Sequence, residues 1–403
     1  MGIEEKIKRS FANLKKDIDD IKSSIETLKK ELKSTKEIKQ KNNSIYTSKP
    51  FVNYDMLESV REVFESGMFS MGEKVREFEK RFAEFTNTKN AIAVSSGTAA
   101  IQIVLESIGI KKDDEIIVPS FTTMPTIEPI LQLGAKPIFV DIDKKTYTID
   151  IKKIEKSITR KTKAIMPVHL YGNPADIKQI KKICDKRGLK LIEDCAQAHG
   201  AFYLGQHVGN FGDAGCFSFY PTKNLTVLGE GGMIITNDDK IAKKCRMIAN
   251  HGEDGRYNHI TIGGNYRLSE IHASIGLKQL ELLESFIRRR RDIARQYDKL
   301  LNKKKIIIPK ETKNGNHCYH LYVIRVNRDK RNTIIERLKK EGIFLGVHYP
   351  IPCHKQKAVI DRFGQSGLPI TEKISKEIIS LPMYPELQDK EISIIAKKIN
   401  GLV

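Results

Sequence analysis

Apolar residues recur along residues 1–40 at alternating spacings of four and three. They are Ile7, Phe11, Leu14, Ile18, Ile21, Ile25, Leu28 and Leu32. This spacing is the a/d seam of a heptad repeat, with Phe11, Ile18, Ile25 and Leu32 at the a positions. The residues between them are mostly Lys, Asp, Glu and Ser, as a solvated helix requires. The pattern predicts a coiled-coil-like helix that joins copies of the chain or binds a partner, which we favour over a helix packed on its own body.

After a polar linker at residues 39–49, short apolar runs alternate with helical segments. Strands are predicted at Ala91–Val94, Glu115–Pro119, Pro137–Asp141, Ala164–Val168, Leu189–Asp194 and Ala214–Tyr220. Helices are predicted at Met56–Ser66, at the segment that carries Val75, Phe78, Phe82 and Phe85, at Ala99–Ile108, from about Thr126, and at Asp176–Arg187. Such alternation is typical of an α/β fold, with a mostly parallel sheet covered by helices on both faces.

From about Gly263 the chain turns helical, with a long segment at Leu268–Asn302. A strand-like run at Leu321–Val326 and a helix near Arg331–Glu341 then predict a smaller C-terminal α+β domain. We therefore expect three parts. Residues 1–45 form the helix and linker, residues 46–265 the large domain, and residues 266–403 the long helix and the small domain.

Composition narrows the classes of protein. The chain has 403 residues, 40% hydrophobic and 30% charged, and it lacks an apolar run of the roughly 20 residues that span a bilayer. Its six cysteines show no CxxC pairing, which predicts reduced thiols, a cytoplasmic protein and no metal site. The net charge of +20 is spread along the chain rather than gathered in a docking motif, so we expect no nucleic-acid partner.

Two residues at predicted strand ends carry candidate chemistry. Asp194 closes one strand, and Lys223 follows another and precedes the glycine-rich turn at residues 229–232. An amine and a carboxylate on neighbouring strand ends suit pyridoxal 5'-phosphate (PLP). The lysine would form a Schiff base, and the aspartate would keep the pyridine nitrogen protonated.

A phosphate site is predicted at the junction of a strand and a helix. Gly97 permits close backbone approach, Thr98 supplies a hydroxyl, and the helix N-terminus offers free N–H groups. Ser-Gly-Thr is also an ordinary helix cap, so the motif by itself is weak. Gln197, about one helical turn after Asp194, is a possible donor to the phenolate oxygen of the cofactor.

The order of these motifs is more specific than any one of them. The motifs are Ser95–Ala100, Val118–Thr122, Glu193–Gly200, Phe217–Phe219 with Lys223, Gly229–Gly232, Gly264–Arg267, Val347–Pro350 and Leu381–Pro385. From about Ser48 to the C-terminus the chain thus resembles the DegT/DnrJ/EryC1/StrS family. These are PLP-dependent aminotransferases of the aspartate-aminotransferase fold that act on nucleotide-linked keto-sugars.

The resemblance implies a role for each matching residue. Lys223 would hold the cofactor and shuttle a proton, Asp194 would pair with the pyridinium, and Gln197 would reach the ring oxygen. Three residues would bind the phosphate: Gly97, Thr98 and Ser218. Asn265 would reach the phosphate of a neighbouring subunit, which implies a homodimer with shared active sites. Candidate substrate contacts are Arg267, for which support of the crossing loop is the alternative, and His348 and Tyr349, for which domain packing is an equal alternative.

Two positions refine the expectation. A dehydratase branch of the family has histidine where this chain has Lys223, so transamination is favoured. The family usually stacks an aromatic residue on the pyridine ring where this chain has Thr123, so a smaller side chain or a shifted Phe121 would have to serve there. We expect glutamate or glutamine to donate an amino group to C3 or C4 of a nucleoside-diphosphate sugar, for surface polysaccharide or glycan biosynthesis. Residues 1–40 would join dimers into a higher oligomer. The alternatives are a sugar dehydratase relative and a regulatory or scaffold protein working through its N-terminal helix.

Overall fold

The computed structural model describes residues 2, 4–5, 12–27 and 44–403. The chain divides into two compact units, residues 1–45 and residues 46–403. In the first unit, residues 12–27 are helical, and the apolar side chains of Leu14, Ile18, Ile21 and Ile25 are exposed. The other four seam positions (Ile7, Phe11, Leu28 and Leu32) lie outside the described residues. The helix therefore agrees with the heptad pattern over its described part, and its pairing stays a prediction.

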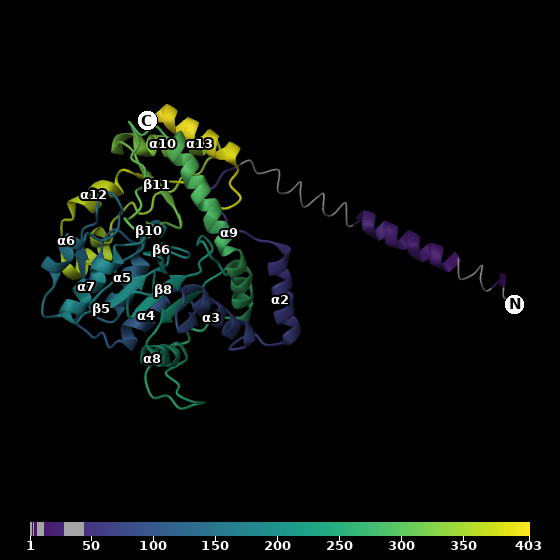
Figure 1. Ribbon diagram of the computed structural model, residues 1–403, viewed down its shortest axis with the longest axis horizontal. Coiled ribbons are helices and arrows are strands. Elements are labelled where there is room, and N and C mark those ends of the chain that lie inside the picture. Colours follow the sequence, from purple (N-terminus) through teal and green to yellow (C-terminus); the bar gives the residue numbers. More distant parts are fainter. Residues whose placement is uncertain (1, 3, 6–11, 28–43) are drawn as a thin grey trace. The chain divides into compact units, whose positions relative to one another are not determined.

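The second unit, which we call the body, is built on a seven-stranded sheet (Figure 1). Its strands, in spatial order, are β1 (Asn90–Val94), β9 (Gly232–Thr236), β8 (Ala214–Ser218), β5 (Lys190–Asp194), β4 (Thr162–Ile165), β2 (Glu115–Pro119) and β3 (Lys136–Val140). Strand β9 runs antiparallel to both of its neighbours, and the other pairings are parallel. All strands except β9 therefore end at the same edge of the sheet, where parallel sheets collect their ligands.

Apolar side chains fill both faces of the sheet. Ile117, Leu191 and Phe217 belong to one buried cluster, and their chain neighbours Ile116 and Ile192 belong to the other. This alternation follows from the period of two in a strand. The covering helices include α3 (Glu73–Thr86), α4 (Gly97–Ser107), α5 (Met124–Gln132), α7 (Ile177–Arg187) and α8 (Asp239–Ala249), whereas α2 (Tyr54–Ser66) packs against α9 (Glu270–Leu300). The predicted α/β architecture is confirmed.

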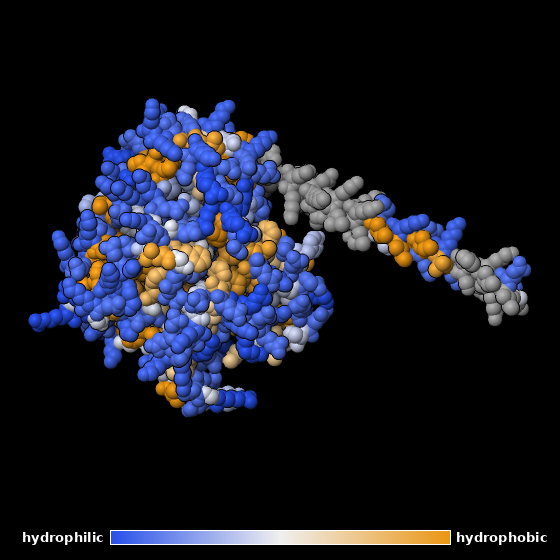
Figure 2. All heavy atoms as spheres, in the orientation of Figure 1, coloured by the Kyte–Doolittle hydropathy of each residue, from blue (hydrophilic) through white to orange (hydrophobic). Residues whose placement is uncertain are grey.

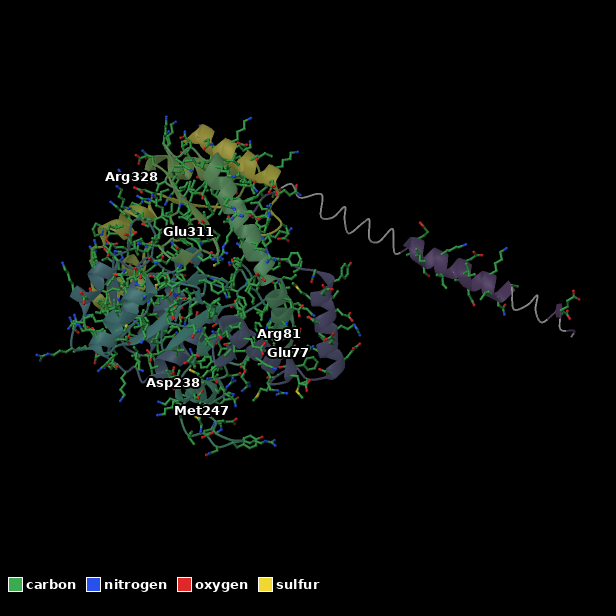
Figure 3. The ribbon with its side chains drawn as sticks, viewed as in Figure 1. Glu77, Arg81, Asp238, Met247, Glu311 and Arg328 are labelled. Carbon is green, nitrogen blue, oxygen red and sulfur yellow. The ribbon has the colours of Figure 1, made fainter. Side chains whose placement is uncertain are left out.

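Local capping and surface pairs define two of these helices. The carboxylate of Asp238 accepts the N–H groups of Lys240 and Ile241 and so begins α8. On the solvent side of α3, Arg81 lies 3.7 Å from Glu77, one turn apart (Figure 3). No helix among the described residues is long and apolar enough to cross a membrane.

Helix α9 (Glu270–Leu300) runs from the sheet to the C-terminal elements of the body (Figure 1). Its buried Arg290 donates to the carbonyls of Tyr319, His320 and Met383, which fixes the following chain against the helix. The C-terminal elements are the antiparallel strands β11 (Tyr322–Arg325) and β12 (Ile378–Leu381) and the helices α10 (Arg328–Lys340), α11 (Lys357–Phe363), α12 (Pro369–Ser375) and α13 (Asp389–Leu402). Short elements complete the body: α6 (Ile151–Ile154), the 3-10 turns η1 (Glu155–Ser157), η2 (Leu170–Gly172) and η3 (Cys353–Lys355), and the small sheet of β10 (Gly315–Asn316), β6 (Phe202–Tyr203) and β7 (Gln206–His207).

Some predicted elements differ from the observed ones. The strand predicted at Ala164–Val168 ends at Ile165, and only a single bridge pairs Val168 with Asp194. Pro167 lies between them and has no N–H to continue the ladder. Strand β9 and helix α8 were not predicted. The apolar run of β9 is short and directly follows the glycine turn, so it was not recognised as a strand. The division of the body at residues 265 and 266 stays a prediction.

Candidate active site

Lys223 lies in the loop that follows β8. Its backbone N–H donates to the carbonyl of Tyr220 (2.9 Å), and the side chain of Asn224 donates to the carbonyl of Cys318 (3.2 Å). The lysine side chain is half-buried. Burial lowers the pKa of Lys223 to about 8, although the carboxylate of Asp194 acts in the opposite direction. Near neutral pH a useful fraction of this amine is therefore unprotonated and nucleophilic.

Asp194 is the last residue of β5 and is buried. One carboxylate oxygen accepts the N–H of Ala196 (3.0 Å), and the other accepts the hydroxyl of Thr126 (2.8 Å). The hydroxyl of Thr122 lies 2.9 Å from that of Thr126 and supports it. Burial raises the pKa of Asp194, while these two donors and the charge of Lys223 lower it. A cationic partner at this carboxylate would favour its ionised form further.

Gly97 and Ser218 form a tight cradle at the N-terminus of α4. A Cβ atom at Gly97 would lie 2.7 Å from the Cβ of Ser218, so only glycine fits. Ser96 caps the helix by accepting the N–H of Ala99 (3.0 Å). The first N–H groups of a helix lack intrahelical acceptors, so those of Gly97 and Thr98 suit an anion. Thr98 and Ser218 are half-buried, within reach of a bound molecule.

Gln197 is held at both ends of its amide. Its oxygen accepts the N–H of Tyr171 (2.7 Å), and its nitrogen donates to the hydroxyl of Tyr349 (2.8 Å). Tyr171 has a left-handed backbone (φ 60°), so the contact with Gln197 fixes an otherwise unfavourable conformation. Burial raises the pKa of Tyr349 to about 12, which keeps its hydroxyl protonated at neutral pH.

His348 and Tyr349 bring the C-terminal part of the body to the same place. The Nδ1 atom of His348 lies 2.8 Å from the hydroxyl of Ser380, and its carbonyl accepts the hydroxyl of Tyr171. Burial, followed by the charge of Lys223, lowers the pKa of His348 to about 4. The imidazole is therefore neutral at pH 7 and can donate or accept a hydrogen bond.

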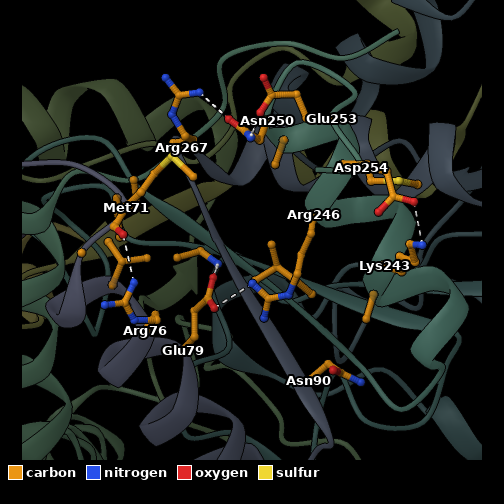
Figure 4. A pocket seen from close by; sticks show the side chains of 18 of the residues that line it. Met71, Arg76, Glu79, Asn90, Lys243, Arg246, Asn250, Glu253, Asp254 and Arg267 are labelled. Carbon is orange, nitrogen blue, oxygen red and sulfur yellow. Dashed lines mark hydrogen bonds and ion pairs between the residues drawn. The ribbon is translucent and has the colours of Figure 1, made fainter. Parts of the chain in front are cut away.

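Asn265 and Arg267 lie on the segment between α8 and α9. The guanidinium of Arg267 donates to the side chain of Asn250 (2.6 Å), as Figure 4 shows. Arg267 and Asn250 line a hollow of about 600 Å³ between α3 and α8. Arg267 is its one lining residue that is also a predicted site residue, so this hollow is distinct from the surroundings of Lys223. Asn265 is exposed, and its neighbour Tyr266 accepts the N–H of Ser95 (2.7 Å).

The residues around Lys223 fit PLP. The cradle of Gly97 and Ser218 leaves backbone N–H groups for a phosphate, and the buried carboxylate of Asp194 suits a pyridinium nitrogen. The lowered pKa of Lys223 suits attack on an aldehyde. When bound, this cofactor supplies an electron sink for breaking bonds at an amine-bearing carbon.

A comparison with protein families decides the assignment. Residues 52–400 match the model of the DegT/DnrJ/EryC1/StrS aminotransferase family. The chain belongs to this family. The predictions of an aminotransferase and of a PLP cofactor are confirmed with it.

Curated relatives and solved structures cover most of the chain. A UDP-2-acetamido-2-deoxy-3-oxo-D-glucuronate aminotransferase of Pseudomonas aeruginosa is 42% identical, over 85% of this chain and 94% of that protein. A protein of Geobacillus stearothermophilus named "Pleiotropic regulatory protein" is 41% identical, over 86% of this chain and 93% of its own length. The crystal structure of ntda from Bacillus subtilis with bound cofactor PMP has a TM-score of 0.82 and 32% identity, covering 90% of this chain and 86% of that one.

The structure brings most predicted site residues of this aminotransferase together. Asp194 and Lys223 affect each other's pKa, Gly97 touches Ser218, and Gln197 contacts Tyr349. Their roles toward cofactor and substrate stay predictions, as do those of Thr98, Thr123, Asn265, Arg267 and His348.

Of the two suggestions for the ring face, the one that used Phe121 gains no support from its position in the structure. Phe121 is fully buried and packs edge-on against Tyr147 and Tyr171, because the chain turns it into the core after β2. Thr123 remains half-buried at the start of α5, and it interacts with the hydroxyl of Tyr349.

Sequence reasoning missed two supporting groups. Thr126 donates to Asp194, and the N–H of Tyr171 holds Gln197. The spacing of Thr122 and Thr126, one helical turn apart, was a usable signal for the first. No local sequence pattern predicts the contact of Tyr171 with Gln197, because it depends on a left-handed residue in a distant loop.

Proposed function

We propose that this aminotransferase moves an amino group from glutamate or glutamine to a keto group of a nucleoside-diphosphate sugar in the cytoplasm, for surface polysaccharide or glycan biosynthesis. The observation that carries the proposal is the pairing of Lys223 with the buried Asp194 beside the cradle of Gly97 and Ser218. The Pseudomonas relative is named for a 3-oxo substrate, which favours C3 over C4.

Each residue then has a task. Gly97, Thr98 and Ser218 hold the phosphate, and Asp194, supported by Thr126, fixes the charge at the ring nitrogen. Lys223, whose pKa lies near 8, takes and returns a proton between the reacting carbons. Arg267, His348 and Tyr349 are proposed to contact the substrate, and the neutral imidazole of His348 would do so by hydrogen bonding.

The proposed active unit is a homodimer in which Asn265 reaches the partner's phosphate site. Asn265 is exposed, and two large apolar side chains shortly before it, Ile260 and Ile262, are 56% and 89% exposed. Exposed apolar side chains on a loop support an interface with another subunit.

Mixing two inactive variants tests this sharing. Lys223→Ala and Asn265→Ala should each be impaired, but a mixed dimer would hold one site with both residues intact. Activity that returns on mixing supports the shared site. If activity does not return while both variants still dimerise, Asn265 does not serve the partner.

The central experiment follows the two halves of the reaction. Glutamate added to the PLP-loaded protein should shift the cofactor absorbance to that of its amine form. A panel of UDP-, GDP- and dTDP-linked 3-keto and 4-keto sugars should then restore the first spectrum for its substrates alone. Failure with every amino donor would reject the aminotransferase activity and favour the dehydratase alternative.

A regulatory role is the second candidate, because one relative carries the printed name "Pleiotropic regulatory protein". Lys223→Ala separates the two in cells. A phenotype that survives this substitution but is lost when residues 1–40 are deleted would favour regulation through the N-terminal helix.

A further inference from the structure

The helix of residues 12–27 presents an apolar stripe to solvent. Leu14, Ile18, Ile21 and Ile25 are 57%, 44%, 59% and 44% exposed, although leucine and isoleucine are normally buried. Figure 2 shows this stripe (orange) along a helix that is otherwise hydrophilic. The stripe lies outside the residues that match the family, 52–400, so the aminotransferase fold does not account for it.

The charges beside the stripe indicate which partner would cover it. In the heptad frame, Lys15 and Lys22 occupy the e positions, and Asp17 occupies the g position between them. The same frame places lysine at the other e positions between residues 8 and 36 as well: Lys8, Lys29 and Lys36. These three lysines lie outside the described residues.

This pattern distinguishes the two orientations of a self-paired helix. In a parallel, in-register pair, each g residue faces the next e residue of the other helix, so Asp17 of one copy meets Lys22 of the second. In an antiparallel pair, e positions face e positions, and lysines would oppose lysines in every register. Lys22 also lies 4.0 Å from Asp19 of its own helix, but both side chains are well exposed and such a pair is weak.

We infer that residues 12–27 form a parallel, in-register coiled coil with the same helix of a second copy of this chain. The apolar stripe supplies the contact, and the pair of Asp17 with Lys22 sets the direction. This inference goes beyond the proposed function, because it concerns an assembly surface that the active site does not use.

Cysteine cross-linking of the full chain tests the direction of pairing. Leu14→Cys and Ile21→Cys place a thiol at two successive d positions, which face their own copies only when the helices are parallel and in register. We expect each variant alone to form a disulfide-linked dimer under mild oxidation. Ser23→Cys, on the outer f position of the same helix, is the matched control and should remain largely unlinked. The native cysteines of the described chain are all buried, so background linkage should be low.

Three outcomes would overturn the inference. One is no more linkage for Leu14→Cys or Ile21→Cys than for Ser23→Cys. Another is linkage only when Leu14→Cys is mixed with Ile25→Cys, a d position with an a position, because that pairing is antiparallel. A third is linkage to a different protein with none between copies.

A charge swap tests the role of the polar pair. In the Leu14→Cys background, Asp17→Lys should reduce linkage, because it sets lysine against Lys22 of the second copy. Adding Lys22→Asp should restore linkage by reversing the pair. If the double variant stays as poor as the single one, the pair does not set the direction. The glutamate-induced absorbance change of the same samples reports the body independently, so a failure here is distinct from a failure of the proposed function.

Discussion

Two neighbouring carboxylates at the end of β5 serve opposite sides of the sheet. The carboxylate of Glu193 accepts a contact from His169 (3.0 Å) and three backbone N–H groups at 2.8 Å each, those of Gly209, Phe211 and Gly212. Asp194 accepts two donors from the protein, fewer than Glu193 does, and the charge of Lys223 lowers its pKa. Two consecutive acidic residues thus differ in their free hydrogen-bond capacity. The carboxylate of Glu193 is fully occupied by donors of the protein, and the carboxylate of Asp194 is available to a ligand.

The hydrogen bonds around Glu193 also account for a cluster that resembles a metal site. His169, Glu193 and Cys195 have ligand atoms within 4.8 Å of one another. The Nδ1 atom of His169 accepts the N–H of Ala175 (3.0 Å), so its Nε2 carries the proton and donates to Glu193. The lone pairs that His169 and Glu193 would offer a metal are already engaged, and their hydrogen bonds stabilise the loops behind β5. Hydrogen-bond capacity, more than residue type, distinguishes the two faces.

Of the substitutions near Asp194, replacement of Lys223 should have the largest effect on activity. Lys223→Ala removes the amine that would hold the cofactor and move the proton, so kcat should fall by about 10³-fold or more. Steady-state assays with the accepted keto-sugar measure this change. Lys178→Ala, an exposed lysine on α7, is the control and should keep full activity. Comparable activity in both variants would remove Lys223 from the reaction.

Asp194→Asn should be the next largest effect. The amide keeps the size of the side chain but loses the charge that faces the ring nitrogen, so kcat should fall by between about 10² and 10³. Urea unfolding should change little, because the amide oxygen can still accept the N–H of Ala196 and the amide nitrogen can donate to the hydroxyl of Thr126. A large loss of stability with unchanged kcat would make Asp194 structural like Glu193.

Glu193→Gln should give the reverse result. An amide nitrogen would face backbone N–H groups that now donate to a carboxylate, and the free energy of unfolding should fall by about 3 kcal/mol. The activity of the protein that remains folded should be nearly unchanged. Denaturant unfolding followed by circular dichroism, with activity measured on the same sample, separates the two quantities.

The sequence predicted the surroundings of Asp194 better than those of Glu193. Asp194, Gly97 and Lys223 were found because each sits where an apolar run ends, and the ends of parallel strands meet at one edge. Glu193 is adjacent to Asp194 and shares its local pattern, yet its partners come from the loop at residues 209–212 and from His169. Such contacts depend on the tertiary path of the chain, which periodicity does not encode.

Strand direction and side-chain orientation were further limits. Strand β9 follows the glycine turn and reverses direction, although its apolar run looks like that of a parallel strand. Phe121 and Thr123 stand two residues apart in one loop, but the first is core and the second is half-buried. Irregular backbone lacks a fixed period, so sequence could not tell which residue faces the site.

The smallest predicted effect concerns the protonation of Lys223. It tests the difference between Asp194 and Glu193 through the pH dependence of PLP capture. The neutral amine captures PLP, and burial places the pKa of Lys223 at about 8. In protein freed of cofactor, the rate of PLP capture should therefore rise with pH and level off above 8, with about a tenfold difference between pH 7 and pH 9. An unperturbed lysine, with a pKa near 10.4, would still be gaining rate at pH 10.

Asp194 and Glu193 should affect this midpoint differently. The carboxylate of Asp194 raises the pKa of Lys223, so Asp194→Asn should move the midpoint of the capture profile to lower pH. Glu193 is not among the groups that shift the pKa of Lys223, so Glu193→Gln should leave the midpoint in place. Stopped-flow absorbance of the parent protein and the two variants between pH 6 and pH 10 measures all three midpoints. Equal shifts in the two variants would mean that the carboxylates share one electrostatic environment, and the division between the two sides of β5 would fail.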